Sequence, residues 1–183
     1  LEKLHDHLQA IKPARTFLLE EFAEFSHVLE AYRDLHLISA KPVLYVCNVE
    51  EALADGESTN QYIDAVADKA REEQAKVVIL SGAIEAELAT LNEQDKLEML
   101  EGLGLTEPGL NRLIRNGYDM LGLQTYFTAG VKEIRAWTIP KEAKAPQAAG
   151  VIHSDFQRGF ICAEVYTISD LLDAGSLTKL KEK

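Results

Sequence analysis

Apolar residues recur at helical spacing along the first 40 residues. Leu4, Leu8 and Ile11 lie three or four positions apart, and a second apolar stripe with the same spacing spans residues 17–32. This spacing is typical of one face of an amphipathic helix. Residues 1–40 are therefore predicted to form two antiparallel helices joined by a turn that follows Ile11.

The middle of the chain alternates between strand and helix patterns. Residues 43–47 and 76–80 are continuous apolar runs rich in β-branched side chains, and residues 62–73 between them have helical spacing. Such runs are typical of buried strands in a parallel sheet. Strand, helix and strand together predict one right-handed crossover unit. Further helices are predicted at residues 84–91, 93–103 and 110–121.

The periodicity changes after Gly122. Residues 124–128 and 133–139 are typical of two strands, and Ala129 and Gly130 lie in the turn between them. This pattern predicts a β-hairpin. Two strands, a helix and a further strand would begin a small α+β roll, and we expect the sequence to stop before the strands that close it. The later elements are predicted as a helix at 147–156, a strand at 160–167 and a last helix capped by Ser169.

Charge divides the chain at nearly the same place as periodicity. The 183 residues are 46% hydrophobic and 27% charged, which is a globular composition. Residues 1–119 hold 11 Lys and Arg against 23 Asp and Glu, whereas residues 120–183 hold 8 against 7. The acidic first part argues against broad nucleic-acid binding there, because phosphate contacts need an excess of cations. The charge step also predicts a domain boundary near Gly122.

The apolar runs and cysteines indicate the compartment. No run is long enough to cross a bilayer, so we expect a cytoplasmic protein without membrane contact. Cys47 and Cys162 each lie in an apolar run and are predicted to be buried thiols in a reducing environment. Nothing in the sequence specifies an oligomeric state.

Two loops at the ends of the predicted strands have the residues of a base-binding site. Ligands bind open α/β sheets at the carboxyl ends of the strands, where Asn48-Val49-Glu50-Glu51 lies. P-loop GTPases have Asn-Lys-x-Asp there, and its Asp accepts from two donors on guanine. With Val49 and Glu51 in the Lys and Asp positions, guanine selection should be lost.

The second loop, Ser81-Gly82-Ala83, follows the next strand, where the same plan presents a backbone N–H to the base. Taken singly, each loop is more typical of an ordinary strand-to-helix turn or helix cap. Two of them on consecutive parallel strands favour a base site.

Other candidate chemistry is weaker. No G-x-x-x-x-G-K-[ST] phosphate loop occurs, so these residues alone should not hydrolyse a nucleotide. His5 and His7 are two positions apart on a predicted helix, which does not favour a metal site. His153 with Asp155 is predicted to be a local hydrogen-bonded pair. The polar stripe formed by Asn111, Arg112 and Arg115 is predicted to be a solvated or interdomain face.

Longer strings extend this interpretation to a family. Besides the two loops, the strings include Glu107-Pro108-Gly109-Leu110-Asn111-Arg112, the segment 123–130 with sequence LQTYFTAG, and the segment 145–156 with sequence APQAAGVIHSDF. From residue 41 onward the chain resembles the Obg-like ATPase family known as YchF. The first 40 residues match in pattern only.

The resemblance implies an α/β protein of three parts. Residues 1–40 would be an inserted antiparallel helical arm, 41–121 the carboxyl-terminal part of a P-loop NTPase domain with its parallel sheet, and 122–183 an incomplete ubiquitin-like (β-grasp) domain of the TGS type. It further implies that the complete protein binds and hydrolyses ATP in preference to GTP, with magnesium held by residues outside this sequence. No catalytic residue is assigned here. The base-binding residues would be Asn48, Val49, Glu51, Ser81, Gly82 and Ala83.

The resemblance also implies a ribosome-linked role in translation or stress, with RNA or ribosome contact by the TGS domain. An alternative function is a non-catalytic module that contacts ribosomal RNA or protein through the arm and the TGS domain. The aromatic residues Tyr126, Phe127 and Trp137 are predicted to be core rather than base-stacking residues. The cations available for RNA contact are Lys132, Arg135, Lys141, Lys144 and Arg158.

Overall fold

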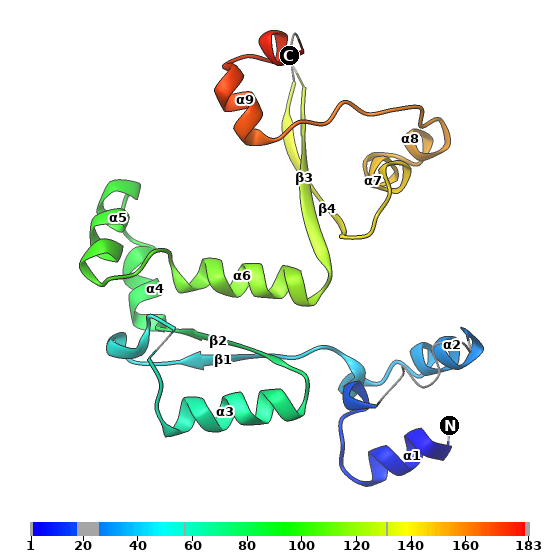
Figure 1. Cartoon of the computed structure of the whole chain (residues 1–183), viewed down its shortest axis with the longest axis vertical. Helices are drawn as coiled ribbons and strands as arrows, with labels where there is room; N and C mark the ends of the chain where they lie inside the picture. Colours follow the sequence, from blue (N-terminus) through cyan, green and yellow to red (C-terminus); the bar gives the residue numbers. More distant parts are fainter. Residues whose placement is uncertain (1, 18–25, 57, 131, 182–183) are drawn as a thin grey trace. The chain divides into compact units, whose positions relative to one another are not determined.

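The computed structural model describes residues 2–17, 26–56, 58–130 and 132–181. The chain divides into two compact units, Leu1–Gly122 and Leu123–Lys183 (Figure 1). The division falls at the glycine where the charge and the periodicity of the sequence change. In the described part of the chain, no helix is both long and apolar enough to cross a membrane.

A two-stranded parallel sheet lies at the centre of the first unit. Strands β1 (Leu44–Asn48) and β2 (Lys76–Leu80) pair in the register Leu44↔Lys76 to Asn48↔Leu80. Helix α3 (Gln61–Glu72) connects them, and Asn60 caps it by accepting hydrogen bonds from the N–H groups of Tyr62 and Ile63. The predicted strand, helix and strand are thereby confirmed.

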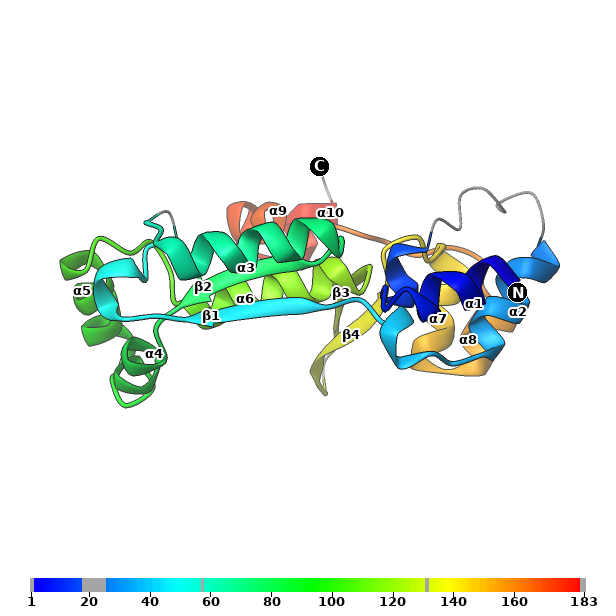
Figure 2. The ribbon, with the colours of Figure 1, turned by 90° about the horizontal axis from the view of Figure 1, so that it is seen from below.

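Helices cover both faces of this sheet. Helix α3 lies on one face and α6 (Gly109–Met120) on the other (Figures 1 and 2). Beyond the carboxyl end of β2, α4 (Gly82–Leu88) and α5 (Glu93–Gly102) follow as separate short helices. Ile84, Leu88 and Leu100 form a buried cluster with Ala54, which fixes the loop after β1 to these helices.

The described residues among the first 40 form short helical pieces. Helices α1 (Glu2–Gln9) and α2 (Ser26–Asp34) are joined to the sheet through the 3-10 turns η1 (Ala14–Thr16) and η3 (Ile38–Ala40). Ala14 is fully buried, and its carbonyl accepts from the Tyr32 hydroxyl at 2.8 Å. The predicted second helix begins at residue 17, but residues 18–25 lie outside the described part of the chain.

Glu73 joins this helical segment to α3 and β1. Its buried carboxylate accepts from the Tyr45 hydroxyl at 2.8 Å and from Lys69 Nζ at 3.1 Å, and it forms an ion pair with Arg15. Hydrogen bonds from Tyr45 and Lys69 hold the pKa of Glu73 below its usual value. Arg15 also donates to the carbonyl of Ser39, so this one carboxylate connects several turns of the first unit.

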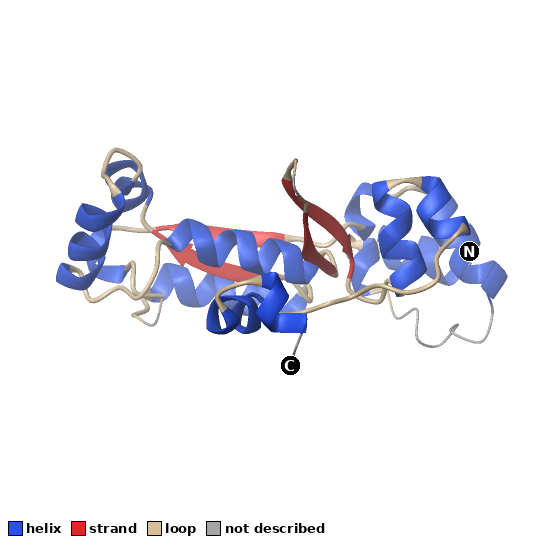
Figure 3. Ribbon diagram, turned by 90° about the horizontal axis from the view of Figure 1, so that it is seen from above, coloured by secondary structure: helices blue, strands red, loops and turns tan. Residues whose placement is uncertain are grey.

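The second unit is built around an antiparallel hairpin. Strands β3 (Leu123–Ala129) and β4 (Ile134–Pro140) pair with Tyr126 opposite Trp137, so the predicted hairpin is confirmed. The hairpin is among the strands drawn red in Figure 3. The helices that follow are α7 (Ala145–Ile152), α8 (Ser154–Arg158), α9 (Ile168–Ala174) and α10 (Leu177–Lys181). The single helix predicted at 147–156 is broken at His153, whose backbone is extended.

Three further predictions for the second unit are wrong. Residues 160–167 form no strand, and Ile161 and Val165 are 91% and 88% exposed because no neighbouring strand among the described residues covers this segment. A hollow of about 830 Å³ is lined by β3, α7 and residues 163–168. Cys162 is exposed for the same reason. Thr167, not Ser169, caps α9, in a reciprocal box with Asp170.

Candidate functional site

The two predicted base loops meet at the carboxyl edge of the parallel sheet. Asn48, the last residue of β1, accepts a hydrogen bond through Oδ1 from the N–H of Gly82 at 2.8 Å. A Cβ at position 82 would lie 3.2 Å from the same oxygen, so only glycine allows this approach without displacing the amide. The side chain of one loop therefore sets the position of the other.

The remaining predicted base residues surround this contact in different environments. The N–H of Val49 donates to the Leu80 carbonyl at 2.9 Å, which extends the parallel ladder by one bond. This N–H is consequently committed to the sheet. Glu51 and Ala83 are exposed, the former at the start of the 3-10 turn η4 (Glu51–Leu53).

Ser81 is the most buried of the predicted site residues. It is 2% exposed, and its hydroxyl Oγ has no hydrogen-bond partner among the described residues. Buried hydroxyls in proteins normally have a partner. A hydroxyl without one at the junction of the two loops is consistent with a site whose hydrogen bonds are completed by another molecule.

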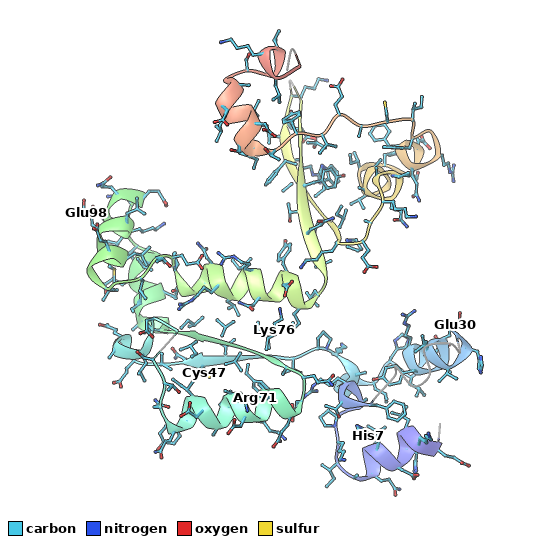
Figure 4. The ribbon with its side chains drawn as sticks, in the orientation of Figure 1. His7, Glu30, Cys47, Arg71, Lys76 and Glu98 are labelled. Carbon is cyan, nitrogen blue, oxygen red and sulfur yellow. The ribbon has the colours of Figure 1, made fainter. Side chains whose placement is uncertain are left out.

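A hollow of about 410 Å³ runs along β1 beside this edge. Its lining includes Asn48 and Val49 from the first loop, together with Asn60 and Tyr62 at the start of α3. Cys47 lies in the same lining and is placed on β1 in Figure 4. Cys47 is half-buried and not fully buried as predicted, and this partial burial raises the pKa of its thiol.

Arg112 differs from its predicted place. It was expected on a solvated or interdomain face, but its guanidinium is partly buried and donates to three backbone carbonyls. The acceptors are Ala54 and Asp55, in the loop after Glu51, and Ile79 on β2. Backbone carbonyls are the same for every residue type, so the acceptors of Arg112 cannot be recognised in the sequence. The sequence pattern therefore gave no indication of this role.

Its neighbour Arg115 has the surface role expected of this stripe. It pairs with Glu107 through two parallel N–H···O contacts, one of them 3.0 Å long. This pairing lowers the pKa of Glu107 and raises that of Arg115. At the start of the same helix, the N–H of Gly109 donates to Glu85 Oε1 at 2.7 Å, which fastens α6 to α4.

Known proteins resemble this chain along nearly its whole length. A family model named YchF-GTPase_C, described as "Protein of unknown function (DUF933)", matches residues 123–183. The chain is 44% identical over 182 residues to the "Ribosome-binding ATPase YchF" of Bacillus subtilis, covering 100% of this chain and 48% of that protein. It is 51% identical over 144 residues to the protein of the same name from Pasteurella multocida, covering 79% and 39%.

A solved structure matches as well. It is described as "Structure of the Schizosaccharomyces pombe YchF GTPase" and superposes with a TM-score of 0.79 at 32% identity, covering 99% of this chain and 47% of that one. The chain belongs to the YchF family. It spans about half the length of the relatives it matches, whose names include both an ATPase and a GTPase.

Basic residues of this YchF chain are spread over the second unit. The five predicted cations are all exposed, and they lie after β3, in β4, in the β4–α7 loop and in α8. Arg135 lies over the Trp137 ring, 4.4 Å from its centroid, and the Trp137 indole donates to Thr128 Oγ1 at 2.9 Å. The Tyr126 hydroxyl donates to the Ala148 carbonyl at 2.9 Å, so it packs toward α7.

Two further predictions can be compared with the structure. Phe127 is 57% exposed and is not a core residue, because its side of the hairpin is left uncovered by the described residues. His153 and Asp155 are local partners as predicted, since His153 Nδ1 accepts from the N–H of Asp155 at 3.2 Å and caps α8. Among the described residues, no group of three or more His, Cys, Asp or Glu could hold a metal ion.

Proposed function

We propose that the first unit supplies the base-recognition part of a purine nucleotide site in an ATP-hydrolysing, ribosome-associated protein of the cytoplasm. The hydrogen bond between Asn48 and Gly82 carries this proposal, because it joins two loops on consecutive parallel strands at the edge where such sheets bind ligands. The unpartnered hydroxyl of Ser81 beside it supports the same interpretation. The YchF relatives named as ribosome-binding ATPases support the wider role.

Each part of the chain has a place in this proposal. Residues 1–40 act as a helical arm, residues 41–121 as part of a P-loop NTPase domain, and residues 122–183 as a β-grasp domain of the TGS type. Asn48 and Gly82 fix the two base loops, and the exposed Glu51 and Ala83 present a carboxylate and a backbone N–H to the base.

ATP is preferred over GTP in this proposal because of Glu51. In guanine-selective proteins an Asp carboxylate accepts hydrogen bonds from two donors on the guanine base. The longer side chain of Glu51 places its carboxylate elsewhere, so selection for guanine is lost. We assign neither a metal ligand nor a catalytic residue to the described residues.

The test is a pair of substitutions that restore the guanine-selective tetrad, Val49→Lys with Glu51→Asp. AMP and GMP are titrated into the isotope-labelled chain, and the amide signals of the two base loops are followed by NMR. We expect the unsubstituted chain to bind AMP more tightly than GMP, and the double variant to shift the ratio toward GMP.

Glu50→Asp is the matched control, because it makes the same chemical change one residue earlier. It should leave the ratio of AMP to GMP affinity unchanged. An unaltered ratio in the double variant would show that the tetrad does not select the base.

A second candidate function is supported by the charge of the second unit. Its five exposed cations and the Arg135–Trp137 stack are suited to phosphate and base contacts, so it would bind ribosomal RNA. Replacing Lys141 and Lys144 by Gln should weaken RNA binding and reduce its dependence on salt, by about one unit of slope for each lysine that binds a phosphate. Binding that does not respond to salt would instead indicate an interaction with protein.

A further inference from the structure

Arg112, on a third element, bonds to backbone that adjoins both base loops. It lies on α6 and donates from Nη1 to the Asp55 carbonyl at 2.7 Å, and from Nη2 to the Ala54 carbonyl at 2.7 Å and the Ile79 carbonyl at 3.0 Å. The first two acceptors follow the turn that begins at Glu51. The third acceptor lies two residues before Ser81. One guanidinium therefore connects the segment that carries each loop.

The Ile79 carbonyl is available to Arg112 because of the parallel pairing. Leu80 faces β1, since its carbonyl accepts from the N–H of Val49. Backbone groups of successive residues in a strand point to opposite sides, so the carbonyl of Ile79 points to the outer edge of β2. The rigid, planar guanidinium can bind several carbonyls at once in a way that a lysine ammonium cannot.

The chain that follows Glu51 is also held by the packing of Ala54, and it passes close to the Arg112 guanidinium at Gly56. Ala54 is 2% exposed and packs with Ile84, Leu88 and Leu100. Gly56 has a φ of +80°, and a Cβ there would lie 2.9 Å from Arg112 Nη1. The chain after Glu51 thus turns through a left-handed residue directly against the arginine, where a side chain would strain the backbone and displace Nη1.

We propose that Arg112 is a positioning residue for base recognition, which holds the loop carrying Glu51 in a fixed relation to the loop Ser81-Gly82-Ala83. The inference rests on the proposed function of these loops. Arg112 itself does not contact the base. Its contribution is to keep the exposed Glu51 carboxylate and the second loop in one arrangement, so that discrimination between purines depends on it.

The test compares Arg112→Lys with Arg115→Lys in the full chain. Both changes keep the charge on α6, but Arg115 pairs with Glu107, which lies in neither base loop. Amide hydrogen exchange is measured for residues 50–56 without ligand, and AMP and GMP affinities are then measured by NMR titration. We expect Arg112→Lys to speed exchange in the loop by about tenfold, as the removal of charged hydrogen bonds implies, and to bring the AMP and GMP affinities closer together.

The controls separate this inference from the proposed function. Arg115→Lys should change neither the exchange of residues 50–56 nor the affinity ratio. If the unsubstituted chain binds neither AMP nor GMP, the proposed function itself fails. If it discriminates between them and Arg112→Lys discriminates equally well, the function stands and the role of Arg112 is refuted.

A second variant covers the case in which Arg112→Lys does not fold. Gly56→Ala leaves the arginine in place and crowds Nη1 from the side of the loop. It should loosen the same residues and reduce the same affinity ratio. A purely structural role for Arg112 predicts lower stability in both variants with the preference for AMP retained, and that result would overturn the proposal.

Discussion

Two glycines of α6 should respond in opposite directions to the same substitution. At Gly109 a Cβ would lie 2.7 Å from the Leu80 Cβ and 3.1 Å from Glu85 Oε1, whereas ordinary contacts begin at 3.4 Å. Gly109→Ala must push α6 away from β2 by several tenths of an ångström. Overpacking of this kind costs about 1–3 kcal/mol. Replacing glycine by alanine also lowers the entropy of the unfolded chain, which stabilises the folded state by about 0.5–1 kcal/mol. We therefore expect the free energy of unfolding to fall by about 1–2 kcal/mol.

Gly117→Ala is the matched change in the same helix. No heavy atom of the described neighbours lies within 4 Å of a Cβ built there. The higher helix propensity of alanine is then the main effect, so the free energy of unfolding should rise by about 0.5–1 kcal/mol in this variant.

Urea unfolding followed by far-UV circular dichroism measures both free energies of unfolding. The two midpoints should move in opposite directions, by about 0.5 M or more for Gly109→Ala. Equal stabilisation by both alanines would refute the close packing of α6 on β2.

Three further outcomes are expected. Ile84→Ala, which empties a 2% exposed position in the first unit, should cost about 2–5 kcal/mol in urea unfolding. The lowered pKa of Glu73 stabilises the folded state above pH 4.5, its ordinary value, and this contribution is lost as the pH falls through the lower folded pKa. The free energy of unfolding of Glu73→Gln should therefore depend less on pH across that range. Thr167→Ala removes the α9 cap and should cost about 0.5–2 kcal/mol, whereas Ser169→Ala should be nearly neutral.

The sequence predicted the parallel sheet and the meeting of the two loops because both follow from local pattern. A continuous apolar run rich in β-branched residues favours a strand of a parallel sheet, and both runs form such strands although Val46 of β1 is 46% exposed. Once residues 43–47 and 76–80 are parallel, their carboxyl ends must lie at the same edge. The contact between Asn48 and Gly82 is then a consequence of topology.

Pattern failed where an element depends on a partner. Residues 160–167 are rich in apolar and β-branched residues and were predicted to form a strand, but a strand forms only when another strand accepts its hydrogen bonds, and Ile161 and Val165 remain exposed. The burial predicted for Cys162 failed with it. His153 broke a predicted helix for a different reason, because its imidazole caps the next helix and so competes with helical backbone bonding.

The contacts that fix the candidate site share one chemical form. Asn48 bonds to the N–H of Gly82, Glu85 to the N–H of Gly109, and Arg112 to three carbonyls. In each case a side chain of one element holds the backbone of another. The identity of the bonding side chain therefore matters more than that of the residue it binds, because nearly every residue type offers the same backbone N–H and carbonyl.

This difference between the bonding side chains and the backbone groups that they bind predicts which substitutions the site tolerates. Ile79→Val keeps the carbonyl that Arg112 binds and removes only one methylene from a partly buried side chain, so base discrimination should persist despite some loss of stability. Arg112→Lys leaves every acceptor in place and removes the planar fork that joins them. If the Ile79 variant lost the preference for AMP and the Arg112 variant kept it, side-chain packing at the strand edge, and not the guanidinium, would position the loops.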